Sequence, residues 1–233
     1  MNFFQKEHKL SKIEITGFIL FSFLFVFLFS DMVVFSPLKY LYTSLHESMH
    51  VVATLLTGGM VTSYVINDDF SGHITRGGGN GVIISTAGYV GSAVVSGLLI
   101  KYSLNNKKSA IVLTCVLISI IVISVVYTET LFSTGFLISL IISVVLLFFV
   151  FKTTLDSHIA IFLGTFFTFQ SLDDIKLYLF RGVQNGEYLQ TDAYLLSTRL
   201  FKTEAFTLPV GAFFAILSVS IWLYFMRSLY KKL

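Results

Sequence analysis

Charged residues are scarce in this sequence. Lysine, arginine, aspartate and glutamate together make up 12% of its 233 residues, whereas soluble domains carry about 25%. The mean hydropathy is +0.82, and there are 25 phenylalanines. These values exclude an ordinary soluble domain and indicate a polytopic protein whose partner is the lipid bilayer. The formal net charge is only +3, so we expect no nucleic-acid partner.

Cysteine is nearly absent as well. The single cysteine, Cys115, excludes both an intramolecular disulfide and a cysteine-based zinc site, and we interpret it as a small buried apolar residue. A glycine-rich run follows Arg76, but it lacks the Gly-Lys-Ser/Thr ending of a phosphate-binding loop. Nucleotide binding is therefore not expected there.

Long apolar runs dominate what is present. We expect an all-α polytopic membrane protein with about six to seven transmembrane helices, because a spanning helix needs about 20 apolar residues. The expected spans are residues 16–35, 38–57, 82–102, 109–127, 131–151, 157–180 and 205–228. Residues 1–15 form a polar N-terminal leader, and residues 16–233 form one membrane-embedded domain. We read the first span as a retained helix, since no small-x-small cleavage site follows it.

A different pattern separates the second and third spans. Residues 60–66 are rich in β-forming side chains, Asn67-Asp68-Asp69 is a turn sequence, and residues 71–75 can form a second strand before the glycines. The sequence therefore predicts a small β-hairpin within residues 60–80. Two strands alone are marginal in water, so this hairpin must pack on the membrane domain or on a bound segment.

The second span contains the motif His46-Glu47-Ser48-Met49-His50. Residues four apart share one face of a helix, so His46 and His50 point the same way and are close enough to hold one metal ion. Glu47 lies beside them, where it can act as a general base without binding the metal. This H-E-x-x-H arrangement is typical of zinc hydrolases, which take a third protein ligand from elsewhere in the chain.

The alternative is that both histidines are polar core residues satisfied by hydrogen bonds, with Glu47 as a pairing partner. Ionisable residues inside an apolar span are costly and usually functional, so the metal site is the better interpretation.

A pair of adjacent carboxylates, Asp173 and Asp174, lies late in the sixth span. Two acids at membrane depth in a chain with two histidine ligands indicate a bound cation. Two other interpretations stay open: one aspartate pairs with Lys176, or the helix ends near Ser171 and both carboxylates are in water.

Small residues mark the third span, in the segment Ala87-Gly88-Tyr89-Val90-Gly91. They allow either close contact between helices or the close approach of an extended substrate. Gly88, Tyr89 and Gly91 are therefore the candidate substrate-binding residues.

These segments together resemble the site-2-protease type of membrane zinc metallopeptidase, in particular its compact bacterial branch without a PDZ domain. The resemblance covers roughly residues 37–225. The segments that carry it are Pro37-Leu38, Leu45-His46-Glu47-Ser48-Met49-His50, Leu55-Leu56-Thr57-Gly58-Gly59, the hairpin with Gly72 and Gly77-Gly78, Ser85-Thr86-Ala87-Gly88-Tyr89-Val90-Gly91-Ser92-Ala93, Leu172-Asp173-Asp174-Ile175 and Thr191-Asp192-Ala193. The second and fifth of these are the specific ones.

The resemblance implies a Zn²⁺ ion bound by two histidines and one aspartate. Carried over to this chain, it assigns His46 and His50 as ligands and Glu47 as general base. Asp174 is the predicted third ligand, because an aliphatic residue follows it, and Asp173 is the second choice. It further implies proteolysis of transmembrane segments of membrane-protein substrates, a hairpin that can present the substrate as an added strand, and a multi-pass location in the cell membrane of a bacterium.

Two other hypotheses compete with this one. The first is a non-catalytic membrane protein that binds or escorts partners with a degenerate site, which the intact motif disfavours. The second is a metal-ion transporter, but we find no internal repeat of the kind that transporters show. No oligomeric state is predicted.

Overall fold

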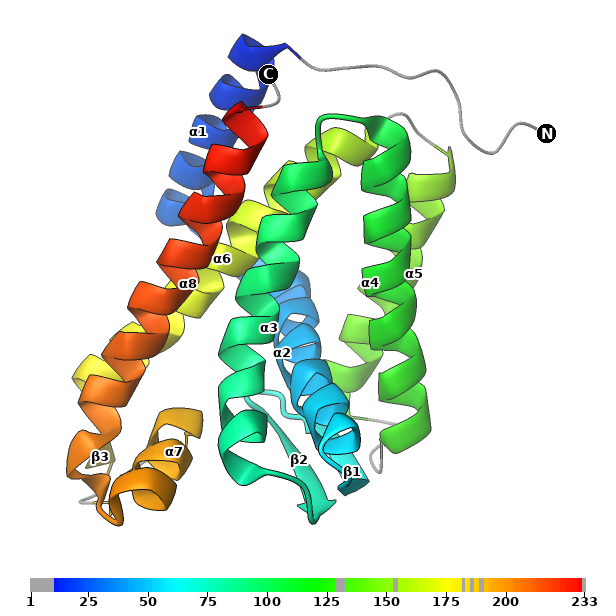
Figure 1. The fold of residues 1–233 in the computed structure, drawn as a ribbon. Coiled ribbons are helices and arrows are strands. Elements are labelled where there is room, and N and C mark those ends of the chain that lie inside the picture. Colours follow the sequence, from blue (N-terminus) through cyan, green and yellow to red (C-terminus); the bar gives the residue numbers. More distant parts are fainter. Residues whose placement is uncertain are drawn as a thin grey trace.

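The computed structural model describes residues 11–128, 133–152, 155–181, 183–184, 187–188 and 191–231, without the side chains of Lys12, Asn106, Lys152 and residues 174–190. The first ten residues of the predicted leader lie outside this part. The elements, shown in Figure 1, are α1 (Lys12–Phe29), the 3-10 turn η1 (Val33–Phe35), α2 (Ser36–Leu56), β1 (Met60–Ile66), β2 (Gly72–Gly77), α3 (Gly81–Tyr102), α4 (Asn106–Tyr127), α5 (Thr134–Lys152), α6 (Asp156–Arg181), β3 (Val183–Gln184), β4 (Glu187–Tyr188), α7 (Asp192–Phe201), η2 (Glu204–Phe206) and α8 (Thr207–Tyr230).

The chain reverses sharply between its first two helices. The stretch from α1 into η1 and α2 is bent by 120°. Helix α1 begins with a capping box, in which the Ser11 hydroxyl accepts from the Glu14 N–H and the Glu14 carboxylate accepts from the Ser11 N–H. Helix α2 starts with Pro37 in its first turn, a position that proline favours because the N–H there has no helical partner.

Helix α3 is the central element. It packs against α2 on one side and against α6 and α8 on the others, and Figure 1 shows it between them. Its N-terminus is capped by Asn80, whose side chain accepts from the N–H groups of Val82 and Ile83. At the far end of the bundle, α1 and α8 lie side by side, and the Thr16 and Tyr230 hydroxyls are 2.7 Å apart.

Strands β1 and β2 pair in an antiparallel register from Met60 opposite Gly77 to Ile66 opposite Gly72, with a bulge between Val61 and Ser63. The glycines after β2 lead the chain into α3 and pass close to the end of α2. Gly79 has φ +73°, and a Cβ there would lie 2.9 Å from the Thr57 hydroxyl, so only glycine fits.

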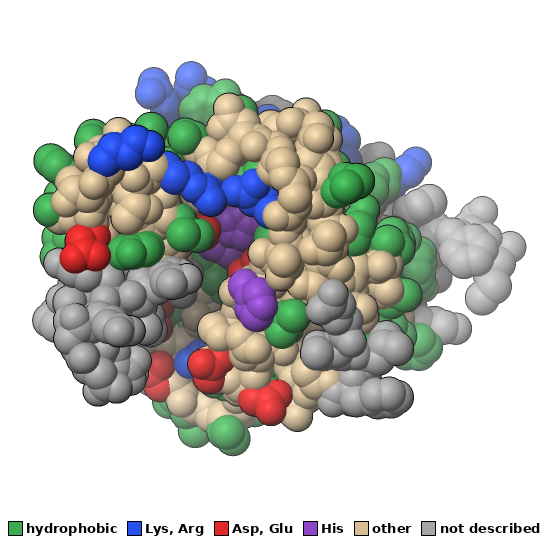
Figure 2. Space-filling view, turned by 90° about the horizontal axis from the view of Figure 1, so that it is seen from below, with side chains coloured by type: hydrophobic (Ala, Val, Ile, Leu, Met, Phe, Trp, Pro, Cys, Tyr) green, Lys and Arg blue, Asp and Glu red, His purple; other side chains and the backbone are tan. Residues whose placement is uncertain are grey.

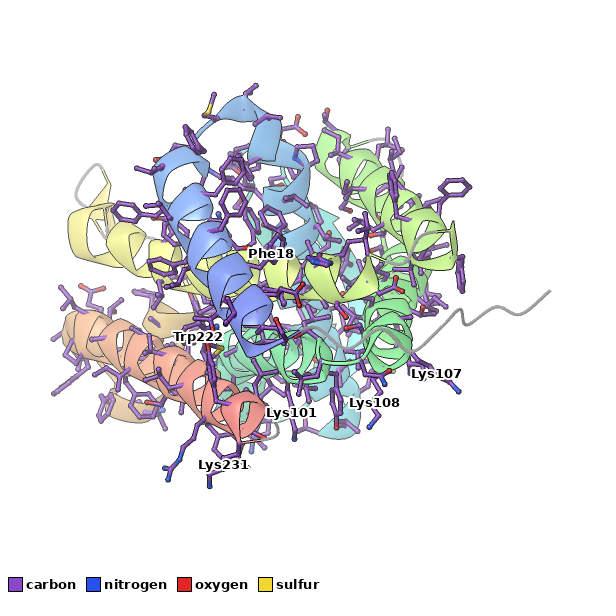
Figure 3. All side chains as sticks on the ribbon, turned by 90° about the horizontal axis from the view of Figure 1, so that it is seen from above. Phe18, Lys101, Lys107, Lys108, Trp222 and Lys231 are labelled. Carbon is purple, nitrogen blue, oxygen red and sulfur yellow. The ribbon has the colours of Figure 1, made fainter. Side chains whose placement is uncertain are left out.

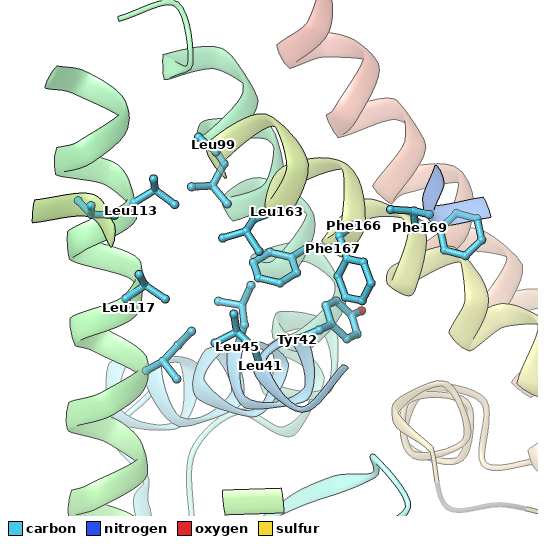
Figure 4. Close-up of a cluster of buried hydrophobic side chains, with 14 of the residues drawn as sticks. Leu41, Tyr42, Leu45, Leu99, Leu113, Leu117, Leu163, Phe166, Phe167 and Phe169 are labelled. Carbon is cyan, nitrogen blue, oxygen red and sulfur yellow. The ribbon is translucent and has the colours of Figure 1, made fainter. Parts of the chain in front are cut away.

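The largest apolar cluster fills the space between α2, α4 and α6 (Figure 4). Its fully buried members include Leu41, Leu45, Leu113, Leu117, Phe166 and Phe167. Between helices in a bilayer, such side chains hold the helices together by close van der Waals packing and not by removal from water. This cluster holds α2, and therefore the H-E-x-x-H motif, in a fixed place in the bundle.

Four described helices are long and apolar enough to cross a membrane: Gly81–Tyr102, Lys107–Tyr127, Thr134–Phe151 and Glu204–Tyr230. The bent pair of α1 and α2 adds a fifth if it counts as one span. The predicted count of six to seven is therefore not confirmed, although helices occupy all seven expected stretches. Large apolar side chains are exposed along these helices, as expected of surfaces in contact with lipid. Cys115 is exposed on α4, so its predicted burial is wrong.

Lysines gather at the end of the bundle opposite the hairpin. Seen from that end, Lys101, Lys107, Lys108 and Lys231 point outward around the helix termini (Figure 3). Lys101 lies over the rings of Tyr102 and Phe225, at 5.5 Å from each centroid. The ammonium group is thus attracted to the negative faces of both rings in a cation–π contact.

The closeness of α3 and α6 gives a first prediction. A Cβ on Gly164 would lie 2.8 Å from the Ser96 carbonyl oxygen, which belongs to the backbone and cannot turn away. We expect Gly164→Ala to destabilise the protein by about 1–3 kcal/mol. Gly17→Ala is the matched control, because nothing lies within 4 Å of a Cβ there. Thermal unfolding in detergent, followed by fluorescence of the single tryptophan, checks this, and equal midpoints for the two variants would contradict it.

Candidate metal centre

The H-E-x-x-H motif lies in the most deeply buried part of α2. His46, Glu47 and His50 are all less than one tenth exposed. As the spacing predicts, the two imidazoles share one face of the helix, with ring centroids 4.8 Å apart and planes at 72°. Both Nε2 atoms therefore point into the same space.

A carboxylate from a distant part of the chain meets them there. Asp192 is the first residue of α7, and its Oδ2 lies 2.9 Å from His46 Nε2 and 3.0 Å from His50 Nε2. The start of α7 is fixed by Thr191, whose hydroxyl accepts from the N–H of Tyr194. One carboxylate oxygen thus faces two imidazole nitrogens that are 146 and 142 residues away in sequence.

The hydrogen bond at the other nitrogen of His50 determines which nitrogen is free. His50 Nδ1 lies 2.6 Å from the carbonyl oxygen of Ile84. A carbonyl only accepts, so Nδ1 carries the hydrogen, and in a neutral imidazole Nε2 then keeps its lone pair. Histidine ligands of metals are held in this way by backbone carbonyls or carboxylates.

The three side chains fit a zinc ion. Among the described residues, His46, His50 and Asp192 form a group whose ligand atoms all lie within 4.8 Å of one another. Two imidazole nitrogens and one carboxylate oxygen are donors that Zn²⁺ prefers, and tetrahedral bonds of about 2.0–2.1 Å separate neighbouring ligand atoms by about 3.3 Å. The observed separations from Oδ2 are only slightly shorter.

The electrostatics of the cluster keep the carboxylate ionised. Burial raises the pKa of Asp192, but the charge and hydrogen bonds of His50 and His46 outweigh burial and hold this pKa well below the ordinary value for aspartate. Asp192 is therefore an anion across the physiological pH range, the form in which a carboxylate binds a metal.

The hairpin turn covers Glu47. The Thr43 hydroxyl donates to the Phe70 carbonyl at 2.7 Å, and the Tyr40 hydroxyl donates to the Asp68 carbonyl at 2.7 Å. These two hydrogen bonds attach the hairpin turn to α2. A Cβ on Gly72 would lie 2.7 Å from Glu47 Cγ. The backbone of β2 therefore runs directly past the candidate general base.

Tyr64 fixes the other strand. Its hydroxyl donates to the Ser44 carbonyl at 3.0 Å, and burial raises the pKa of Tyr64 to about 12, so it remains a neutral donor. Between the hairpin, α2, α3 and α7 lies a cavity of about 290 Å³ that His46, Glu47, His50 and Asp192 all line.

Of the candidate substrate-binding residues, Tyr89 lines this cavity, where its ring lies 4.9 Å from His46 and stacks on Phe214. Gly88 and Gly91 let α3 approach α2. A Cβ on Gly88 would collide with Nε2 of both histidines, and a Cβ on Gly91 would collide with Met49. Close packing is thus the observed role of the two glycines.

The structure does not test the predicted third ligand. The backbone of Asp174 lies in α6, but its side chain is outside the described residues, so its role stays a prediction. Asp173 is described and is not part of the His46–His50–Asp192 group. In the sequence, Thr191-Asp192-Ala193 is one of the segments that carry the resemblance, but no role is predicted there for Asp192. The signal present was a helix-capping threonine directly before an aspartate, in the polar stretch ahead of the last span.

Two imidazoles, a carboxylate and a neighbouring glutamate thus meet inside an apolar helical bundle. Residues 19–225 match the family model described as Peptidase M50B-like, and the chain belongs to this site-2-protease family of integral membrane metallopeptidases. No curated protein and no solved structure matches.

Gly88 provides a test of the site geometry. We expect Gly88→Ala to weaken the binding of Zn²⁺ or Co²⁺ by more than about tenfold, because the added methyl group occupies the space of both Nε2 atoms; loss of outer-shell support alone costs 10–100-fold. Isothermal titration of the metal-depleted protein measures this affinity. Gly17→Ala, which meets nothing within 4 Å, is the control, and equal affinities in the two variants would refute the packing described here.

Proposed function

We propose that this protein is an intramembrane zinc protease that cuts membrane-protein substrates in or near their transmembrane segments, the chemistry of regulated intramembrane proteolysis. The observation that carries the proposal is the single oxygen of Asp192 facing Nε2 of both H-E-x-x-H histidines. In this proposal Asp192 replaces Asp174 as the third ligand. A place in the cell membrane of a bacterium is part of the same proposal and rests on the resemblance.

His46, His50 and Asp192 would hold the ion at the wall of the cavity. When bound, zinc supplies a Lewis acid that polarises a peptide carbonyl and lowers the pKa of water to about 7. Glu47 lines the same cavity, next in sequence to His46. Its carboxylate would accept the proton of the attacking water and pass it to the nitrogen of the leaving amine.

The substrate must be extended before it can react, since a transmembrane helix hides its carbonyls in hydrogen bonds to the N–H four residues later. The cavity gives an extended segment two contacts. Gly72 and Ile74 of β2 line one wall, and Tyr89 of α3 lines another. We propose that β2 aligns the segment by strand pairing and that Tyr89 packs against it.

Zinc content separates the two candidate aspartates. We expect about one zinc per chain in protein purified in detergent without chelator. Asp192→Asn should lower zinc affinity by more than about 100-fold, because losing a ligand costs more than the 10–100-fold loss of an outer-shell partner. Metal analysis after dialysis against a zinc buffer measures this.

Asp174→Asn is the matched variant, and we expect it to retain zinc. Zinc lost from Asp174→Asn but kept by Asp192→Asn would restore the original ligand assignment. Absence of zinc from the wild-type protein would contradict the proposal that it is a zinc protease and would favour a non-catalytic role.

Glu47 is tested by removing its basicity alone. We expect Glu47→Gln to keep zinc and to lose cleavage by about 100-fold or more, since a general base contributes about 100- to 10,000-fold. Cleavage of a reporter membrane protein in co-expressing cells, scored by immunoblot, provides the readout. Glu204→Gln, an exposed acid ahead of α8, should cleave like the wild type. Undiminished cleavage by Glu47→Gln would remove Glu47 from the mechanism.

A further inference from the structure

Two arginines face the cavity that holds the candidate metal centre. Arg76 comes from β2 and Arg199 from α7, and both line the cavity together with His46, Glu47 and His50. Seen from the hairpin end, Lys and Arg side chains border the hollow in which histidine side chains are visible (Figure 2). Neither arginine has a role in the proposed hydrolysis.

Arg199 is held firmly in place. Its Nη1 donates to the Gly81 carbonyl at 2.6 Å and to the Ser85 hydroxyl at 2.9 Å. A Cβ on Gly81 would lie 2.8 Å from Arg199 Cζ, so the guanidinium rests on the glycine backbone. Only Nη1 makes these bonds. A guanidinium has five N–H groups, so Nε and Nη2 remain as donors for a ligand.

Among the side chains that the structure describes, no acidic group forms an ion pair with either arginine. The ion pairs among the described residues join Lys39 to Asp31 and the two histidines to Asp192, and none includes Arg76 or Arg199. Arg76 donates through Nη1 to the Gly78 carbonyl, which leaves its charge uncompensated. Burial and the nearby charge of Arg199 lower the pKa of Arg76. An anion between the two guanidinium groups would relieve this repulsion.

The geometry of α7 sets the distance from the reacting bond. Asp192, Leu195 and Arg199 line the cavity from one face of the helix. Seven residues of α-helix rise about 10.5 Å. An extended peptide covers this distance in about three residues. An anion bound at Arg199 would therefore belong to a residue a few positions from the bond held at the metal centre.

We infer that Arg76 and Arg199 form a carboxylate-binding subsite that selects substrates with an acidic group a few residues from the cleaved bond. The position of the cut rests on the proposed function, but binding of the carboxylate does not. The carboxylate has two possible sources, an aspartate or glutamate side chain within the substrate or a free C-terminus. If the carboxylate is an internal side chain, the protein is an endopeptidase that prefers acidic substrates. If it is a free C-terminus, the protein releases short C-terminal peptides.

Binding of short labelled peptides tests the subsite. The probes are fluorescein-labelled peptides of alanine, serine and leucine: one with an internal glutamate and an amidated C-terminus, its glutamine counterpart, and one without glutamate but with a free C-terminal carboxylate. Fluorescence anisotropy with the full-length protein, in detergent and chelator, gives each Kd. Chelator keeps zinc from binding the carboxylate itself, so the result does not depend on proteolysis.

We expect the wild type to bind a carboxylate probe about tenfold more tightly than the glutamine probe, as charge-assisted bidentate pairing predicts. The stronger of the two carboxylate probes identifies the source. Arg76→Gln and Arg199→Gln should each reduce the preference, and the double variant should abolish it. Lys202→Gln, which removes a positive charge just after α7 outside the cavity lining, should keep it.

Arg76→Gln distinguishes binding of the carboxylate by the arginines from a structural role of Arg199 in holding α7. Arg199 also ties α7 to α3, so its loss alone could act by loosening α7, whereas the bond of Arg76 is within the hairpin. An unchanged preference in Arg76→Gln would overturn the inference. Equal binding of all probes by the wild type, or no measurable binding of any, would overturn it as well. Failure of the proposed protease function would appear separately, as absent zinc or absent cleavage.

Discussion

The contact on which the site depends joins Asp192 to His46 and His50. It brings the first residue of a short helix, α7, against the middle of α2, and no local preference of either segment requires this. A carboxylate beside two imidazoles in a buried cavity is stable only if its charge is balanced, by protonated imidazoles or by a cation. The fold therefore supplies an arrangement that a divalent metal completes.

Close packing around glycine gives this contact its precision. Gly88 brings the backbone of α3 onto the histidine rings, Gly72 brings the hairpin onto Glu47, and Gly81 accommodates Arg199. Side chains at these positions would push apart the elements that form the cavity walls, which are the hairpin, α2, α3 and α7. Hydrogen bonds to backbone carbonyls, such as that of His50 Nδ1 to Ile84, then fix the orientation of each group. Rigid elements hold metal ligands more exactly than flexible loops do.

Local patterns predicted much of this and missed what depends on long-range contact. Hydropathy located the helices, and the four-residue spacing placed His46 and His50 on one face. The number of spans is not confirmed, because apolar length alone does not distinguish a crossing helix from one half of the sharply bent α1–α2 pair. The role of Asp192 was missed because its partners are more than 140 residues away. Nothing short of the tertiary fold distinguishes it from other aspartates in polar segments.

The most direct test asks whether residue 192 touches the metal. In zinc-loaded Asp192→Cys, X-ray absorption at the zinc edge should show a new sulfur neighbour at about 2.3 Å, since a thiolate replaces the carboxylate oxygen. Asp174→Cys, measured alongside, should show nitrogen and oxygen neighbours only. A sulfur neighbour in Asp174→Cys and none in Asp192→Cys would contradict the metal centre described here.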